Sequence, residues 1–307
     1  MNLAAGWRIA VLGILLGGVG RAPCAAQSAV ILHVATVDNT EPGQTHVDEP
    51  LLNDFEGTSY PLVVGFRNPA GGSGVANPDD FDIFWNGIDN RWAISNRSGD
   101  VPLGATFVVW VPRPLELQLP GLGATYRHLM TVANTTGAVT TLSHPLLDGH
   151  PEARVQAHWG GGGFFLATAP AAFYDGAASR WKVRNQDGSN LPVPTWVHVG
   201  VDRCGLGRDA ATVELATVDC AAPDGATCVA DLSAPRGFLP MFAALDAGVL
   251  DDHPIAAYWD EVGESWDVIN EDAAAMPAGA DFFAAFSSLI FEHGFDGGTS
   301  RGWIAVP

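Results

Sequence analysis

Short runs in which apolar and polar residues alternate follow one another along most of the chain, separated by clusters of Gly, Pro, Asn and Asp. Alternation with a period of two is typical of half-buried strands, and no segment sustains the 3.6-residue period of a helix. The 36 glycines, 21 prolines and abundant aromatic residues agree with many short strands and turns. The first third of the chain is predicted to form strands near 30–37, 45–48, 60–67, 81–85, 91–96 and 105–111.

One motif occurs three times. An aromatic pair is followed by Asp or Asn, then by Trp seven positions after the second aromatic residue, and then by Asn four positions later. The tryptophans of the motif are 89 and 85 residues apart. A period of this length predicts a repeated small domain rather than a solenoid unit. The motif occupies residues 84–96, 173–185 and 258–270.

Each motif is predicted to fold as a β-hairpin with its turn between the second aromatic residue and the Trp. These two rings then lie opposite each other on neighbouring strands, where an aromatic pair contributes up to ~1 kcal/mol and fixes the register. The predicted cross-strand pairs are Trp85 with Trp92, Tyr174 with Trp181, and Trp259 with Trp266.

The predicted fold is all-β, with three tandem β-sandwich-like repeat domains after a signal peptide. A single closed propeller-like array, in which each unit supplies two four-stranded blades, is the alternative. It ranks second because Pro-rich linkers separate the units. The predicted boundaries are 1–26 for the signal peptide, 27–112, 126–202 and 212–287 for the repeat domains, 113–125 and 203–211 for the linkers, and 288–307 for a C-terminal extension.

The first residues predict export. Trp7 and Arg8 precede the apolar run 9–20, and small residues lead to a cleavage site after Ala26. The run is too short to span a bilayer, and no other segment has eighteen uninterrupted apolar residues. We therefore expect a mature protein that starts at Gln27, has no membrane span, and is secreted, periplasmic or at the cell surface.

The chain is strongly acidic, with 34 acidic residues against 15 basic ones and a net charge of −19. This charge argues against nucleic acid as a partner, because a polyanion would be repelled. It makes calcium the most plausible metal, since Ca²⁺ takes six to eight oxygen ligands from acidic loops. Solvated loop acids are the simpler interpretation. The candidate ligands are Asp79, Asp80, Asp82, Asp251 and Asp252.

Three cysteines remain after the predicted cleavage, and export permits a disulfide. Cys220 and Cys228 flank a segment with a Pro-Asp-Gly turn signal, so a bridge between them is the preferred pairing and Cys204 is left over. The spacing does not suit a zinc site.

No catalytic motif is visible: the chain lacks a nucleophile elbow, a zinc-protease helix, a phosphate-binding loop and a dinucleotide fingerprint. The leading hypothesis is a non-enzymatic extracellular binding or surface-interaction protein for a glycan or protein ligand, with multivalent contacts. The alternatives are a secreted polysaccharide-acting hydrolase and a structural envelope component. Candidate binding residues are the tryptophans off the hairpins, Trp110, Trp159 and Trp196.

The third motif and its surroundings resemble secreted bacterial proteins made of tandem copies of an uncharacterised β-rich domain. The resemblance rests on His253-Pro254-Ile255, Tyr258-Trp259, Trp266, Val268, Asn270, Asp272 and Met276-Pro277, and on Pro-Leu-Leu at 50–52 and 145–147. The first unit departs from the pattern, with Arg97-Ser98 where the others have Gln186-Asp187 and Glu271-Asp272. The resemblance implies fold and export, and it brings no established activity.

Overall fold

The computed structural model describes residues 29–48, 50–53, 61–66, 75–111, 123–160, 166, 168–202, 213–221, 227–229, 239–245, 248–260, 265–287, 289–292 and 304–305. Within these ranges the prediction of an all-β fold is confirmed: the regular structure is strand, apart from the single-turn helix α1 (Pro50–Asn53). No helix in this part of the chain is long and apolar enough to cross a membrane.

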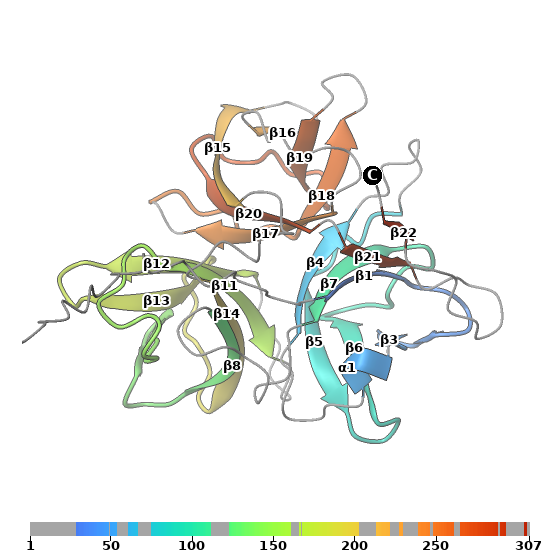
Figure 1. The fold of residues 1–307 in the computed structure, drawn as a ribbon, viewed down its shortest axis with the longest axis horizontal. Coiled ribbons are helices and arrows are strands. Elements are labelled where there is room, and N and C mark those ends of the chain that lie inside the picture. The colour runs from blue at the N-terminus through green and yellow to red at the C-terminus, as the bar shows by residue number, and fades with distance from the viewer. Residues whose placement is uncertain are drawn as a thin grey trace, which may run out of the picture.

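The strands form three open sheets (Figure 1). The first sheet has the order β19 (Ser265–Asn270), β18 (Ile255–Asp260), β4 (Leu62–Phe66), β7 (Thr106–Val111), β1 (Ala29–Val34), β21 (Leu289–Glu292), β22 (Ile304–Ala305). The second has the order β2 (Thr40–Glu41), β3 (Gln44–Val47), β6 (Arg91–Asn96), β5 (Phe81–Asn86), β11 (Arg154–Gly160), β14 (Thr195–Asp202), β8 (Gly123–Met130). The third has the order β16 (Thr227–Val229), β15 (Val213–Ala221), β20 (Asp281–Ser287), β17 (Leu239–Leu245), β12 (Pro170–Asp175), β13 (Arg180–Asn185), β10 (Val139–Thr141), β9 (Thr135–Thr136).

The first strand of each hairpin that carries the aromatic motif pairs in parallel with a strand that is distant in the sequence. Hairpin β5–β6 pairs in parallel with β11, β12–β13 with β17, and β18–β19 with β4. The last pairing joins the C-terminal third of the chain to its N-terminal third. The propeller-like alternative is therefore wrong: the sheets are open, because each hairpin extends a neighbouring sheet at one edge instead of closing a four-stranded blade.

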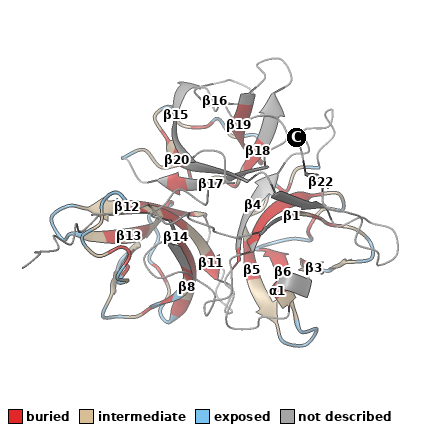
Figure 2. Cartoon of the chain, in the orientation of Figure 1, coloured by how far each residue is buried: buried red, intermediate tan, exposed pale blue. Residues whose placement is uncertain are grey.

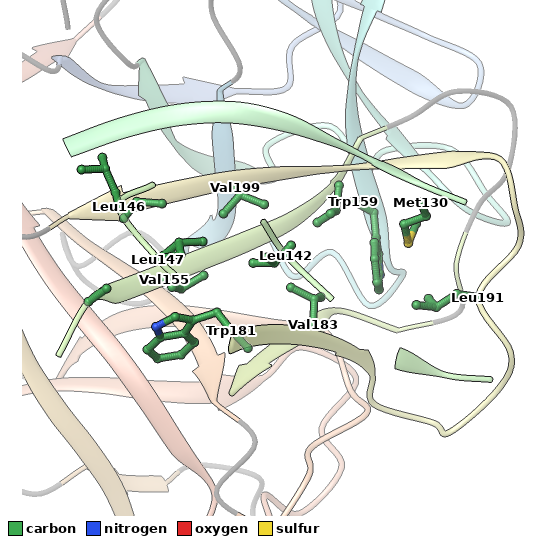
Figure 3. Packing of buried hydrophobic residues seen from close by; sticks show 14 of the residues in the cluster. Met130, Leu142, Leu146, Leu147, Val155, Trp159, Trp181, Val183, Leu191 and Val199 are labelled. Carbon is green, nitrogen blue, oxygen red and sulfur yellow. The ribbon is translucent and has the colours of Figure 1, made fainter. Parts of the chain in front are cut away.

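The hydrophobic cores lie between two sheets, as in a sandwich. One core packs β1 and β7 of the first sheet against β3, β5 and β6 of the second, around fully buried Phe107 and Ile94. Another packs β8, β11 and β14 against β12 and β13, with Trp159 and Val199 facing Val183 (Figure 3). In Figure 2 the residues coloured as buried accordingly lie mostly in these strands, and those coloured as exposed lie mostly in the loops.

The predicted hairpin register is confirmed in all three motifs. Trp85 pairs with Trp92, Tyr174 with Trp181, and Trp259 with Trp266. In the first two pairs the rings meet edge to face, with centroids 5.9 and 5.7 Å apart. This geometry suits the quadrupoles of two aromatic rings. The pairs therefore fix the register, as the spacing predicts.

The domain boundaries remain a prediction, with two structural facts that bear on them. First, the parallel pairings connect strands on opposite sides of every predicted boundary between repeat domains. Second, the C-terminal extension supplies β21 and β22, and β21 pairs in parallel with β1. The predicted signal peptide lies outside the described residues.

Candidate functional site

The acidic residues proposed as calcium ligands come from two short segments, 79–82 and 251–252, and the fold brings these segments to one seam between hairpin β18–β19 and hairpin β5–β6. At this seam the backbone N–H of Asn77 donates to the Glu271 carboxylate. The Asp80 carboxyl interacts electrostatically with Asp272 and His253. We call Asp79, Asp80, Asp82, Asp251 and Asp252 the acidic seam.

Three carboxyls of the acidic seam bind protons more tightly than usual. Burial raises the pKa of Asp80 to about 7, against the opposing charge of Arg97. Burial raises the pKa of Asp251 to about 6, and it raises that of Asp82 well above its ordinary value. Asp82 and Asp251 are only 3% and 2% exposed, and one oxygen of each has no hydrogen-bond partner. Such groups are poorly placed to reach a large substrate.

The acidic seam does not form a compact metal site in the described residues, because no three of its ligand atoms lie within 4.8 Å of one another. One group elsewhere does meet this condition: Glu41, His46 and Asp89. Sequence analysis missed this group because its members lie on β2, on β3 and in the turn after β5. Their proximity depends on the pairing of β3 with β6, and no sequence motif predicts this pairing.

The candidate binding tryptophans have different environments. Trp110 and Trp159 are 7% and 3% exposed, and the Trp159 indole N–H donates to the carbonyl of Thr168. Neither ring is open to a ligand in this structure. Trp196 is partly exposed, and the Arg127 guanidinium lies over its ring, 3.9 Å from the centroid. Of the three, Trp196 is the one placed to contact a partner.

The backbone register places Cys220 opposite Cys228 on the antiparallel strands β15 and β16, next to an irregularity in the pairing. Adjacent strands bring paired Cα atoms to about 5 Å, which suits a disulfide. Their side chains, and Cys204, lie outside what the structure describes, so the bridge stays a prediction.

The two histidines at corresponding sequence positions have the same surroundings. His33 Nε2 is 2.9 Å from Thr45 Oγ1, and His128 Nε2 is 3.0 Å from Thr140 Oγ1. Both side chains are buried. This is the environment of buried, hydrogen-bonded packing residues.

His158 and His198 form a second histidine pair, on β11 and β14, which no sequence motif predicts. The two residues are register partners. Burial lowers the pKa of His158 to about 4 and that of His198 to about 3, where the neighbouring His158 acts in the same direction. Each Nδ1 lies within hydrogen-bond distance of a backbone carbonyl, that of Trp159 or Pro61. At neutral pH both imidazoles are therefore neutral and fixed in place.

These features define an all-β protein with open sheets and two-layer cores. The model of a domain of unknown function, DUF7452, matches residues 83–201, which run from β5 to the end of β14. No curated protein and no solved structure matches the chain. The match bears out the resemblance to an uncharacterised domain over this stretch, whereas secretion and tandem repetition stay predictions.

Proposed function

We propose that the chain is an exported, non-enzymatic binding or surface-interaction protein, built from three copies of one unit, whose ligand is an extracellular glycan or protein. The observation that carries the proposal is a rigid loop, present twice, with an exposed valine at its tip. The loops are residues 36–39 and 131–134, and the valines are Val37 and Val132, which are 75% and 86% exposed.

The two loops are held by the same hydrogen bonds. In the first, the Asn39 side chain accepts from Thr36 N (2.7 Å) and donates to the carbonyl of Val34 (2.9 Å). In the second, Asn134 bonds Thr131 N (2.8 Å) and the carbonyl of Leu129 (2.9 Å) in the same way. A loop fixed in this way loses little conformational entropy when it binds a partner.

A second apolar side chain is exposed at the same end of the sheet as each valine. Leu103, 53% exposed, directly precedes Gly104, whose backbone N–H donates to the carbonyl of Ala35. Val193, 37% exposed, precedes the start of β14, which pairs with the end of β8. Single exposed valines are common on protein surfaces. Here, however, two similar rigid loops each expose a valine with an apolar neighbour, and this repetition favours contact with a partner.

Multivalency follows from this arrangement. Two similar weak contacts on one rigid scaffold bind a repetitive surface about 10²- to 10⁴-fold more tightly than one contact does. Glycans and surface-protein arrays present such repeated epitopes. The net charge of −19 supports a polar, solvated outer surface around the contacts.

A polysaccharide hydrolase is the second candidate, and the raised pKa of Asp80 and Asp251 favours it. A carboxylic acid that keeps its proton near neutral pH can act as a general acid in glycoside hydrolysis. The burial of Asp251 weighs against it, because a general acid must reach the glycosidic oxygen.

One experiment separates the two candidates. The mature chain, residues 27–307, is applied to a glycan array and to an array of extracellular proteins, and the hits are assayed for release of reducing ends. We expect binding without release. Val37→Asp and Val132→Asp should each weaken binding by about 100-fold or more, because each removes one of two linked contacts. Ile88→Asp changes an exposed apolar side chain at a hairpin tip and is the matched control.

Release of reducing ends that is lost in Asp80→Asn would favour the hydrolase. Binding to which neither valine contributes would contradict the proposed contact loops. The absence of any ligand on both arrays would favour a structural envelope component.

A further inference from the structure

A compact set of three potential metal ligands lies where hairpin β2–β3 meets the turn of hairpin β5–β6. His46 Nε2 is 3.2 Å from Glu41 Oε1 and 3.9 Å from Asp89 Oδ2. All three ligand atoms lie within 4.8 Å of one another. The side chain of His46 is 12% exposed, and those of Glu41 and Asp89 are 51% and 40% exposed. The group therefore has a half-buried imidazole at its base and carboxylates open to water.

These separations fit one small divalent ion. Ligand atoms that sit about 2.0–2.1 Å from a tetrahedral ion lie roughly 3.3 Å apart. The two distances from His46 Nε2, 3.2 and 3.9 Å, fall near this value. One imidazole and two carboxylates leave a fourth position for water. An imidazole ligand suits zinc and related transition metals, whereas calcium and magnesium prefer oxygen alone.

The two carboxylates are held in place by side-chain amides. Gln44 Nε2 donates to Glu41 Oε1. Asn86 Nδ2 donates to Asp89 Oδ2 at 2.7 Å, and Asn86 Oδ1 accepts from the backbone N–H of Ile88 at 3.0 Å. Partners of this kind orient metal ligands and reduce the entropy lost when the ion binds.

At the corresponding place beside hairpin β12–β13, a lysine side chain supplies a positive charge. The backbone register equates Glu41 with Thr136 and His46 with Thr141, and the turn positions equate Asp89 with Ala178. None of these three residues is a metal ligand of comparable strength. Instead Lys182 Nζ lies 2.6 Å from Asp175 Oδ2.

The charge balance of the two places therefore differs. Beside β12–β13 the lysine, which is the only one in the chain, neutralises the carboxylate of Asp175. Beside β5–β6 the ion pairs of Glu41 and Asp89 in the described residues go to His46 alone. With a neutral imidazole this group has a net charge of −2, which a divalent cation would neutralise.

We propose that Glu41, His46 and Asp89 bind one divalent transition-metal ion, of the zinc class, with water completing its coordination. The proposal is independent of the contact loops and of the calcium hypothesis, whose five residues lie at the acidic seam.

The test is calorimetric titration of the purified, tag-free chain with Zn²⁺, after treatment with EDTA and its removal. We expect one equivalent to bind. Glu41→Gln, His46→Gln and Asp89→Asn should each weaken the binding by at least about 10-fold, since each removes one ligand of three. Co²⁺ gives a second readout: a visible absorption band typical of tetrahedral coordination, lost in His46→Gln.

His150→Gln is the matched control. It removes a histidine that pairs with a single carboxylate, Glu152, at 2.9 Å on the surface, and it should leave the titration unchanged. Thermal melts without metal should coincide for Glu41→Gln, Asp89→Asn and His150→Gln, because these side chains are at least partly exposed and ion pairs at the surface contribute little to stability.

Three outcomes would overturn the proposal: no stoichiometric binding of Zn²⁺, binding that the three ligand variants leave unchanged, or Ca²⁺ binding at the same residues with equal affinity. A variant that gains a second zinc site tests the proposal without depending on lost binding, which misfolding could also cause. Thr136→Glu, Thr141→His, Ala178→Asp and Lys182→Ala together should add a second equivalent of Zn²⁺.

Discussion

Two buried polar pairs occupy corresponding places beside hairpins β5–β6 and β18–β19, and they differ by one functional group. The first pair is Asn77 with Asn96, and the second is Asp251 with Asn270; the partners in each are 19 residues apart. Asn77 and Asn96 each donate to the other, at 2.9 and 2.8 Å. Asn270 donates to Asp251 at 3.1 Å, but Asp251 Oδ2 and Asn270 Oδ1 have no partner.

The comparison explains the protonation of Asp251. A neutral carboxylic acid has one O–H donor, so protonated Asp251 can supply the donor that Asn77 supplies with its N–H. An ionised Asp251 is an acceptor only, and it leaves the Asn270 oxygen buried without a donor. Burial, together with the charges of Asp252 and Asp272, raises the Asp251 pKa to about 6, while the Asn270 bond and His253 oppose the rise. The first pair is therefore insensitive to pH and the second is not.

Loss of the amide in the first pair should have the largest effect. Asn96→Ala removes the partner of Asn77, which is 2% exposed, and a donor to the carbonyl of Asp100. The cost of leaving buried polar groups without partners is about 3 kcal/mol here. Urea unfolding should show it as a lower midpoint. Asn190→Ala, at an exposed position, should cost less than about 0.5 kcal/mol. Equal midpoints for the two variants would mean that the amide pair contributes nothing.

Exchanging the two pairs should exchange their pH dependence. The pKa of Asp251 is about 6 in the folded state, against an ordinary value of 3.8 for an aspartate in the unfolded chain. The folded state therefore keeps a proton that the unfolded state has lost, and stability falls as pH rises from about 4 through about 6. At pH 8 Asp251→Asn should be more stable than the parent by about 2 kcal/mol, and at pH 4 the two should be equal.

The reciprocal variant, Asn77→Asp, should lose stability by a similar amount between pH 4 and pH 8. The free energy of unfolding as a function of pH measures both effects. Asp252→Asn changes a neighbouring carboxyl whose side chain is 54% exposed, and it is the control. A pH slope that persists in Asp251→Asn would assign it to Asp80 or Asp82, whose raised pKa values predict the same sign.

The hairpins illustrate what the sequence predicts well. Trp85 and Trp92 are seven positions apart, so their pairing follows from spacing alone, and the structure has it. The pairing of Asn77 with Asn96 depends on contacts between elements that no local sequence pattern predicts. The same holds for the proximity of Glu41, His46 and Asp89. The acidic seam is an intermediate case. Its residues were singled out from composition, but the parallel pairing of β18 with β4, which brings the two loops together, has no sequence signal.

Thr168 and Asn185 form a third version of the buried polar pair, beside hairpin β12–β13. Its disruption should reduce stability less than disruption of the Asn77–Asn96 pair. Thr168 Oγ1 donates to Asn185 Oδ1 at 2.6 Å and accepts weakly from Asp187 N at 3.4 Å. Thr168→Val keeps the shape and removes the hydroxyl. We expect a loss of about 1.5 kcal/mol, because Asn185 keeps its bonds to Ser189. Thr168→Ser restores the hydroxyl and should recover most of the stability; a Ser variant as weak as the Val variant would point to the methyl group instead.

The smallest expected effect concerns the hairpin turns beside the first and third versions of the pair. Asn90 and Ser179 hold the corresponding turn position, both with φ of 52°. Asn tolerates this left-handed conformation better than Ser, because its side chain can bond the local backbone. Ser179→Asn should therefore stabilise the chain by roughly 0.5 kcal/mol, about 1 °C in the thermal midpoint. Asn90→Ser should destabilise it by the same amount. Shifts of the same sign in both variants would show that the contacts of the turn, and not its backbone conformation, decide its stability.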